Sequence, residues 1–397
     1  MDARQQRGIQ IAAEAGAVVS DGRTWRVRSQ TQGAKNYRVN PHAVSCSCPD
    51  HETTGDKCKH IHAVLITMSI EHTEAGTVVT ATRQTYSQDW ATYNRCQVNE
   101  KDDFMALLAD LCSTIEQPVQ AKGRPRLPLG EMVFAMAYKV FSGYSTRRFS
   151  SDLRGAHENG LISRVPHFNS VSNYMSDERL TPILMALITE AALPLRGLET
   201  EFAIDSSGFN TGQLTTWLDT KHGVRNVKSQ HQWVKAHIMV GTLTNIVTSV
   251  EMSDWKGADS PYFPALVEAT TKEFTVDEIS ADKAYLSKSN IELAENVGAV
   301  PFVPFKKNSA DPGMVDSAWA RMYHRFMADR EVFMTHYHRR SNVETTFSMI
   351  KMKFGGSVRS KSATGQANEV LCKILCHNIV CVAQAIAEFG IDAKFAQ

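Results

Sequence analysis

The chain has 397 residues, of which 43% are hydrophobic and 21% charged, and its formal net charge is +1. This length and composition are typical of a folded chain of two or three domains, and no apolar stretch approaches the ~20 residues that cross a bilayer. The first residues lack the apolar core of a signal peptide, so we expect an intracellular protein that does not enter a membrane. Basic residues gather in 122–154 and again in 339–361, where Glu344 is the one acid.

The pattern of residues divides the sequence into five segments. Residues 1–83 hold short β-type runs and a cluster of Cys and His, and residues 84–129 end in a basic stretch rich in Gly and Pro, which is typical of a linker or an extended arm. Residues 130–197 have helical spacing, residues 198–365 alternate between strand and helix patterns, and residues 366–397 are expected to form a C-terminal helix.

The first segment contains four closely spaced metal-ligand side chains. Cys46 and Cys48 lie in a strand-like run, and Cys58 and His60 lie where a helix is expected to begin. Three thiolates and one imidazole suit a closed, tetrahedral Zn²⁺ site, which would pin a β-hairpin to that helix. Chance clustering in a reduced chain is the alternative. Other imidazoles nearby are rivals of His60: His42, His51 and His62.

The Cys-x-Cys and Cys-x-His pairs, preceded by strand patterns at Thr24–Val27 and Asn36–Val39, resemble the SWIM zinc finger. That module is known from transposases and from other DNA-associated proteins. The resemblance implies a zinc cofactor, and it leaves open whether the module binds DNA or a protein partner.

The remaining cysteines stand among apolar neighbours. In an intracellular chain we expect them to be reduced and to pack as small hydrophobic residues. They are Cys96, Cys112, Cys372, Cys376 and Cys381.

The middle of the chain combines a basic arm with predicted helices. Lys122-Gly-Arg-Pro-Arg126 resembles an arm that enters the DNA minor groove. Tyr144–Leu153 could form part of a helix-turn-helix-like DNA reader, and a small bundle packed on the following domain is the alternative. Helices are expected over Asp103–Glu116, Gly130–Phe141, Thr146–Arg154 and Ser176–Ala192.

From Glu201 onward the pattern changes to strands and crossovers. Strands are expected over Glu201–Ile204, His231–Thr242, Ile246–Met252, Val276–Ala281 and Ala299–Phe305. Helices are expected over Pro261–Phe274, Ser289–Asn296, Asp316–Ala328 and Phe333–Phe354. Three strands followed by alternating helices and strands is the order of an RNase H-like sheet. The predicted fold class is therefore α/β: an RNase H-like domain, with a mixed sheet and flanking helices, behind a small β-hairpin/helix zinc module and a helical segment.

Three acidic residues in this domain are candidate metal ligands. Asp205 and Asp282 each end an expected strand, and Glu344 lies on a later helix, so the three carboxylates can converge at one edge of the sheet. Such oxygen ligands suit Mg²⁺ or Mn²⁺, and two ions ~4 Å apart can promote phosphodiester cleavage. The alternatives are structural: an Asp after a strand often begins a turn, and Ser341 with Glu344 fits a helix capping box.

The helix that carries Glu344 has two distinct faces. Tyr337, Arg340, Glu344, Ser348 and Lys351 fall within an arc of about 80°, because each residue turns a helix by ~100°. An adjacent apolar stripe would pack on the sheet, and it consists of Val343, Phe347, Ile350 and Phe354. An acid between cations suits a DNA backbone lying across a metal site.

The spacing of Tyr337, Arg340, Glu344 and Lys351 resembles the Y-R-E-K signature of bacterial insertion-sequence transposases of the DDE type. Ile-Asp-Ser-Ser-Gly around position 205 and Ala-Asp-Lys-Ala-Tyr around position 282 resemble the two aspartate motifs of that family. The resemblance runs from about residue 124 to about residue 375. It implies a catalytic, Mg²⁺-binding triad of Asp205, Asp282 and Glu344.

The same resemblance implies that Tyr337, Arg340 and Lys351 hold the DNA of the transposon end. The segment between the second Asp and the Glu is short, which implies that the large insertion domain of some relatives is absent. A hairpin-forming cleavage strategy that depends on such an insertion is therefore not expected, and the cleavage route stays open. Three further residues have open roles: Trp255 could stack on a flipped base or belong to the core, and Lys306 and Lys307 could contact phosphates or face solvent.

We therefore expect a DNA transposase that binds the terminal repeats of a mobile element, cleaves phosphodiester bonds and joins the ends to target DNA. Its partner would be double-stranded DNA, with a dimer in the synaptic complex, in the cytoplasm at the nucleoid of a prokaryote. The alternatives are a nuclease that cuts without joining, a catalytically inactive or domesticated DNA-binding relative, and a zinc-organised interaction scaffold.

Overall fold

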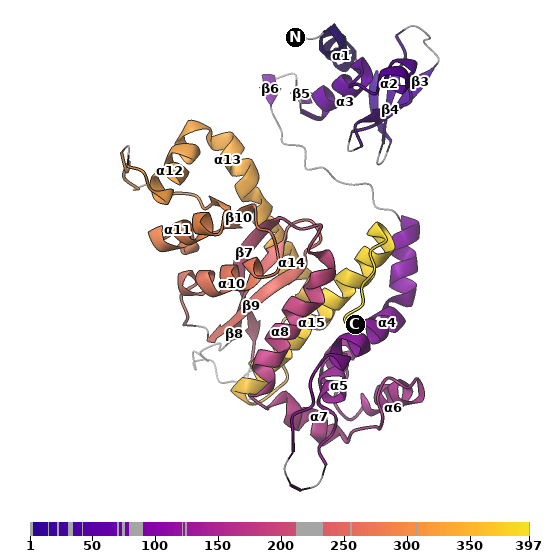
Figure 1. Cartoon of the computed structure of the whole chain (residues 1–397), viewed down its shortest axis with the longest axis vertical. Coiled ribbons are helices and arrows are strands. Elements are labelled where there is room, and N and C mark those ends of the chain that lie inside the picture. The colour runs from indigo at the N-terminus through magenta and orange to yellow at the C-terminus, as the bar shows by residue number, and fades with distance from the viewer. Residues whose placement is uncertain are drawn as a thin grey trace, which may run out of the picture. The chain divides into compact units, whose positions relative to one another are not determined.

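The chain forms two compact units, Met1–Ala91 and Thr92–Gln397, which are described separately (Figure 1). The computed structural model describes residues 3–396 except 15, 22–23, 31–34, 42, 70, 74–75, 79–89, 121, 124, 212–232, 255, 307–308 and 314. The predictions for His42, Trp255 and Lys307 concern positions outside the described residues. The finer division into five segments remains a prediction.

The first unit is built on a small antiparallel sheet in the order β1-β2-β3-β4. The elements are α1 (Ala3–Ala13), β1 (Val18–Asp21), β2 (Thr24–Arg28), β3 (Asn36–Asn40), β4 (Ser45–Cys46), α2 (Pro49–Thr54), α3 (Lys59–Ser69), β5 (Glu71–Thr73) and β6 (Gly76–Val78). Tyr37 and Val39 alternate with exposed residues along β3 and turn inward toward Ile61 of α3. The module is thus larger than the predicted hairpin and helix, and it has a hydrophobic core of its own.

The second unit is organised around a mixed five-stranded sheet in the order β11-β10-β7-β8-β9. Its strands are β7 (Glu201–Asn210), β8 (Trp233–Gly241), β9 (Val247–Asp254), β10 (Glu278–Ala281) and β11 (Val300–Phe302). β7, β8 and β9 pair antiparallel, whereas β10 is parallel to β7 and β11 is parallel to β10. This is the predicted α/β, RNase H-like arrangement, and the proline-containing last strand lies at the edge as expected.

Helices cover both faces of this sheet (Figure 1). They are α4 (Trp90–Ser113), α5 (Leu129–Ser142), α6 (Ser150–Glu158), α7 (Phe168–Met175), α8 (Leu180–Ala192), η1 (Leu193–Leu195), η2 (Ser260–Tyr262), α10 (Phe263–Thr271), η3 (Lys283–Tyr285), α11 (Lys288–Asn296), α12 (Ala318–Ala328), α13 (Arg330–Tyr337), η4 (His338–Arg340), α14 (Ser341–Phe354) and α15 (Ala363–Phe389). Successive residues of β7 point to opposite faces. Ala203 and Phe209 therefore pack toward α14 and α15, and Phe202 and Ile204 pack toward α10 and α11.

Several predicted elements differ from the observed ones. β7 does not end at Asp205 but continues to Asn210, because β8 pairs with it along its whole length. The predicted helix Phe333–Phe354 is interrupted by the 3₁₀ turn η4. The capping-box interpretation of Ser341 is wrong: the preceding residue keeps helical dihedral angles and no side chain caps α14, so there is no free helix start at that position.

The helical segment also differs in detail. The helix expected over Ser176–Ala192 corresponds to α8, which begins at Leu180, and α7 before it was not predicted. α6 starts later than expected, at Ser150. Residues 159–167 separate α6 from α7, a connection longer than the 3–4-residue turn of a helix-turn-helix unit. A DNA-reading role for Tyr144–Leu153 stays a prediction.

The long helix α15 packs against both α5 and α8. By length and composition it could cross a membrane, with a mean hydropathy of 1.8 in its most apolar window, which differs from the expectation that no such stretch exists. Because 72% of that window is buried, α15 has the properties of the core helix of a folded domain. Cys372, Cys376 and Cys381 are buried along it as predicted.

Asn378 connects α15 to its neighbours and is completely buried. Its side-chain oxygen accepts from the Val247 amide at 3.0 Å, and its amide nitrogen donates to the carbonyl oxygens of Ile188 and Val247 at 2.9 and 2.7 Å. Three buried backbone groups, from α8 and β9, therefore depend on one side chain.

We expect Asn378→Ala to lower the free energy of unfolding of the full chain by about 2–5 kcal/mol, because buried backbone groups lose their partners. Urea unfolding followed by circular dichroism measures the effect. Asn94→Ala, at an exposed position of α4, is the matched control and should change stability by less than about 0.5 kcal/mol. Equal midpoints for the two variants would contradict the structural role of Asn378.

Candidate active site and zinc site

The pairing of β10 with β7 places the two aspartates side by side. Ala281 is the register partner of Ile204 in this parallel pair, so Asp282 and Asp205 follow at the next level on strands ~4.8 Å apart. Asp205 lies on the same face of β7 as Ala203, which is the face toward α14. The expected convergence of the two aspartates is therefore present, although Asp205 lies within a strand rather than at its end.

Glu344 reaches the same edge from α14. The helix buries Val343, Phe347 and Ile350 against the sheet, which is the apolar stripe predicted from the sequence, while the Glu344 side chain is 59% exposed. One guanidinium group joins it to the first aspartate: Arg340 Nη1 lies 2.7 Å from Asp205 Oδ2, and Nη2 lies 2.7 Å from Glu344 Oε1. The three acidic side chains, far apart in sequence, thus surround one small region.

The electrostatics of this region fit a cation-binding site. Burial raises the pKa of Asp205, and the negative charges of Asp282 and Glu344 raise it further, against the opposing effect of Arg340. Hard carboxylate oxygens with an unfavourable mutual repulsion are the donor set that a divalent cation stabilises. In this structure Arg340 stands between Asp205 and Glu344, so the carboxylates are less tightly gathered than the zinc ligands described below.

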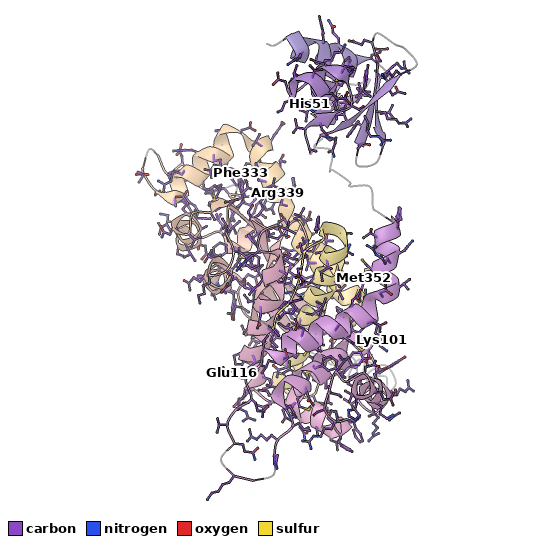
Figure 2. All side chains as sticks on the ribbon, turned by 45° about the vertical axis from the view of Figure 1, so that its right-hand side comes forward. His51, Lys101, Glu116, Phe333, Arg339 and Met352 are labelled. Atoms are coloured by element: carbon purple, nitrogen blue, oxygen red, sulfur yellow. The ribbon has the colours of Figure 1, made fainter. Side chains whose placement is uncertain are left out.

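The other two predicted DNA-binding residues contact residues on or next to the two strands that carry the aspartates. The Tyr337 hydroxyl lies 3.5 Å from Asp282 Oδ1, a long hydrogen bond. Lys351 Nζ donates to Ser207 Oγ at 2.6 Å and lies over the ring of Phe209, and burial lowers its pKa. Lys351 thus lies along β7, and Tyr337 lies beside Asp282 at the end of β10. Arg339, which is labelled in Figure 2, pairs instead with Glu278 at 2.8 Å.

A polar cluster that the sequence reasoning missed lies on the opposite face of β7. Asp259 accepts a hydrogen bond from Ser206 Oγ at 3.0 Å and pairs with Lys235, and His237 Nδ1 is 3.5 Å from the same carboxylate. Burial lowers the pKa of His237 to about 4, so the ring is neutral at pH 7. Lys235 and His237 alternate with apolar residues in β8, which was a usable signal, whereas Asp259 lies in a loop without a motif.

Lys235, Asp259 and Asp205 line one open cavity of about 660 Å³ at the end of the sheet. Gly208 also lines it, and a Cβ there would meet the Trp233 ring at 2.6 Å, so glycine permits the close approach of the indole. Lys306 is exposed, and its role stays a prediction.

In the first unit, the predicted zinc ligands come together. One ligand atom from each of Cys46, Cys48, Cys58 and His60 lies within 4.8 Å of the others, and all four side chains are buried. His60 Nδ1 is 3.9 Å from Cys46 Sγ and 3.8 Å from Cys58 Sγ, close to the separation between ligands of a tetrahedral Zn²⁺ ion. The residues therefore fit a Cys₃His zinc site with Nδ1 as the imidazole ligand.

The surroundings of this site agree with metal binding. Cys48 begins α2 as its N-cap and accepts the amide hydrogen of His51 at 3.4 Å, an interaction that stabilises a thiolate. The hydrogen bond shared by Cys46 and Cys58 lowers the pKa of Cys58 and raises the pKa of Cys46. The imidazole of His51 instead contacts the carbonyl oxygen of Asp56 at 2.7 Å, so this rival lies outside the cluster.

Two family models match the parts of the chain that contain these two sites. Residues 196–379 match the family model of the transposase DDE domain, and residues 37–68 match that of the SWIM zinc finger. A probable transposase for insertion sequence element ISA1214 from Archaeoglobus fulgidus is 27% identical over 223 residues, which cover 55% of this chain and 66% of that protein. The chain thus spans just under two thirds of the length of this curated relative. No solved structure matches the chain.

For the zinc site, we expect the purified chain to contain about one Zn²⁺ per molecule, measured by plasma mass spectrometry. His60→Ala should lose most of the metal because it removes one of four ligands. His51→Ala is the matched control and should retain it, since only the backbone amide of His51 contacts a ligand. Equal zinc contents in the two variants would overturn the choice of His60.

Proposed function

Because this chain carries a transposase DDE domain over residues 196–379 and a SWIM zinc finger over residues 37–68, we propose that it is a DNA transposase of the insertion-sequence type. It binds the ends of a mobile element, cleaves them and joins them to target DNA. The observation that carries the proposal is the convergence of Asp205, Asp282 and Glu344 at one edge of the RNase H-like sheet. The same arrangement supports a DNA-cleaving enzyme in preference to an inactive relative.

The three carboxylates would hold the catalytic Mg²⁺ or Mn²⁺, in a site for two ions. Bound there, the metal supplies activation of an attacking oxygen and stabilisation of the leaving one. Arg340 lies between two of the ligands and is placed to turn toward a DNA phosphate once a cation satisfies the carboxylates. Tyr337 and Lys351 would orient the phosphates of the element end beside the scissile bond.

Two successive displacements make up the proposed reaction. In the first, a water oxygen attacks the phosphorus, the bond from phosphorus to the 3′ oxygen breaks, and a 3′-hydroxyl is released. In the second, that hydroxyl attacks a phosphorus of the target strand, and the target's own 3′ oxygen leaves. Both steps need the developing negative charge to be neutralised at the same edge of the sheet.

The proposed partner is double-stranded DNA, as terminal repeats and as target, with two chains in the synaptic complex because two ends must be held together. The proposed location is the prokaryotic cytoplasm, in association with the nucleoid. The zinc module would recruit DNA or a protein partner.

We expect Asp205→Asn, Asp282→Asn and Glu344→Gln each to reduce cleavage and strand transfer by about three orders of magnitude or more, while binding of the element ends changes little. Each variant removes a charge from the metal site without changing the shape of the side chain. Glu292→Gln, at an exposed position of α11, is the matched control and should keep full activity. Substantial turnover in any triad variant would show that the assignment of that residue is wrong.

A second experiment separates a transposase from a nuclease. Labelled duplexes that carry the element's own ends are incubated with the full chain, Mg²⁺ and a supercoiled plasmid. We expect label covalently attached to the plasmid, because the freed 3′-hydroxyl is the nucleophile of the second step. Cleaved ends without attachment would indicate a nuclease, and intact ends would favour a DNA-binding relative without activity.

A further inference from the structure

A second polar cavity lies away from the carboxylates, between α5, α7 and the loop 355–362 that joins α14 to α15. Its volume is about 490 Å³, and its charged lining consists of Lys139, Arg359 and Lys361. Hydroxyl groups of serine and threonine residues make up most of the remaining polar lining, and none of the described lining residues is acidic. We call this cavity the basic pocket.

Helix α15 holds the loop that supplies Arg359 and Lys361. Lys373 Nζ donates to the carbonyl oxygens of Gly355 and Ser357 at 2.6 and 2.7 Å, and the carboxylate of Glu369 accepts from the amide of Arg359 at 3.0 Å. Lys373 and Glu369 are only 2% and 3% exposed. The Glu369 carboxylate thus binds the loop backbone and does not pair with the cationic side chains. The loop holds these side chains in place before a ligand binds.

The cations of the basic pocket are available to a ligand. Among the described residues, the amino groups of Lys139 and Lys361 have no hydrogen-bond or ion-pair partner. Arg359 donates to the carbonyl oxygen of Gly143 at 2.6 Å, which leaves further guanidinium N–H groups. Cations gathered without an acid repel one another, and an anion that lies between them removes this repulsion.

The same loop connects the basic pocket to the candidate active site. The Asn210 amide donates to the carbonyl oxygen of Gly356 at 3.0 Å, and the Val358 amide donates to that of Asn210 at 2.9 Å. Asn210 and Gly356 line the cavity that contains Asp205. Arg359 is three residues beyond Gly356, at most about 10 Å along the chain. A single DNA strand can therefore lie along the loop and contact both sites.

We infer that the basic pocket binds the sugar–phosphate backbone of the DNA duplex, beyond the phosphate that is cleaved; this inference rests on the proposed function. The contacts are to phosphates, so they fix the position of the duplex and do not read its sequence. Inorganic phosphate shares this chemistry, and the experiment separates the two sources.

The test uses the full chain and a fluorescent, mixed-sequence duplex of about 40 base pairs, with binding followed by anisotropy as the KCl concentration is varied. For Lys139→Gln with Lys361→Gln, the slope of log affinity against log salt should become shallower by about 2, and affinity at 0.1 M salt should fall by roughly 10- to 100-fold. Lys272→Gln with Lys394→Gln is the matched control, since both side chains are exposed and outside the pocket. Lys139→Arg with Lys361→Arg should keep the wild-type slope.

Each other outcome overturns the inference. Equal slopes for the pocket variant and the control, with end cleavage intact, would remove the pocket from DNA binding and leave the proposed function standing. Failure of the wild-type chain to bind the duplex would overturn the inference, whereas the proposed function is decided separately by cleavage and joining of the element's own ends. Inorganic phosphate binding is measured by calorimetry. If the pocket variant loses phosphate binding but keeps the wild-type slope of log DNA affinity against log salt, the pocket is a small-anion site instead.

Discussion

The candidate active site depends on the in-register, parallel pairing of β10 with β7. This pairing sets Asp282 beside Asp205, and the two-residue period of the strand turns Asp205 toward α14. A shift of one residue would move Asp205 to the face of α10 and α11, away from Glu344. β7 continues to Asn210 and pairs with β8 along this stretch, so Asp205 has regular strand both before and after it in the sequence. Its backbone therefore has little freedom to move.

Around this arrangement the charges are balanced by Arg340 of η4 and Lys351 of α14, the helix that supplies Glu344. Arg340 joins two of the carboxylates. Lys351 contacts Ser207, which lies two residues beyond Asp205 on β7. A site built in this way carries its counter-charge when no divalent cation is present, which limits the cost of gathering three acids. The proposed reaction requires Arg340 to exchange its carboxylate partners for a DNA phosphate.

Local patterns in the sequence predicted most of the fold and the candidate site, because strand alternation, helical spacing and ligand spacing are local properties. The order of strands and helices along the chain, the Cys₃His cluster and the apolar stripe of α14 follow from such patterns. The continuation of β7 past Asp205 was not predictable, because it depends on a partner strand about 30 residues away. Asp259 and the basic pocket were missed for the same reason: long-range packing brings their residues together, and no motif marks them.

The buried face of α15 carries polar side chains at nearly regular intervals, and each has a different partner. Glu369 and Lys373 hold the loop before the helix, His377 contacts the carbonyl oxygen of Asn245 at the β8–β9 turn, and Asn378 contacts β9. One inserted residue in the middle of this helix would rotate the later side chains by about 100° relative to the earlier ones. The helix could then no longer make its hydrogen bonds to the loop before it and to the β8–β9 region at the same time. Changes in the length of α15 should therefore be far less tolerable during divergence than changes in its composition.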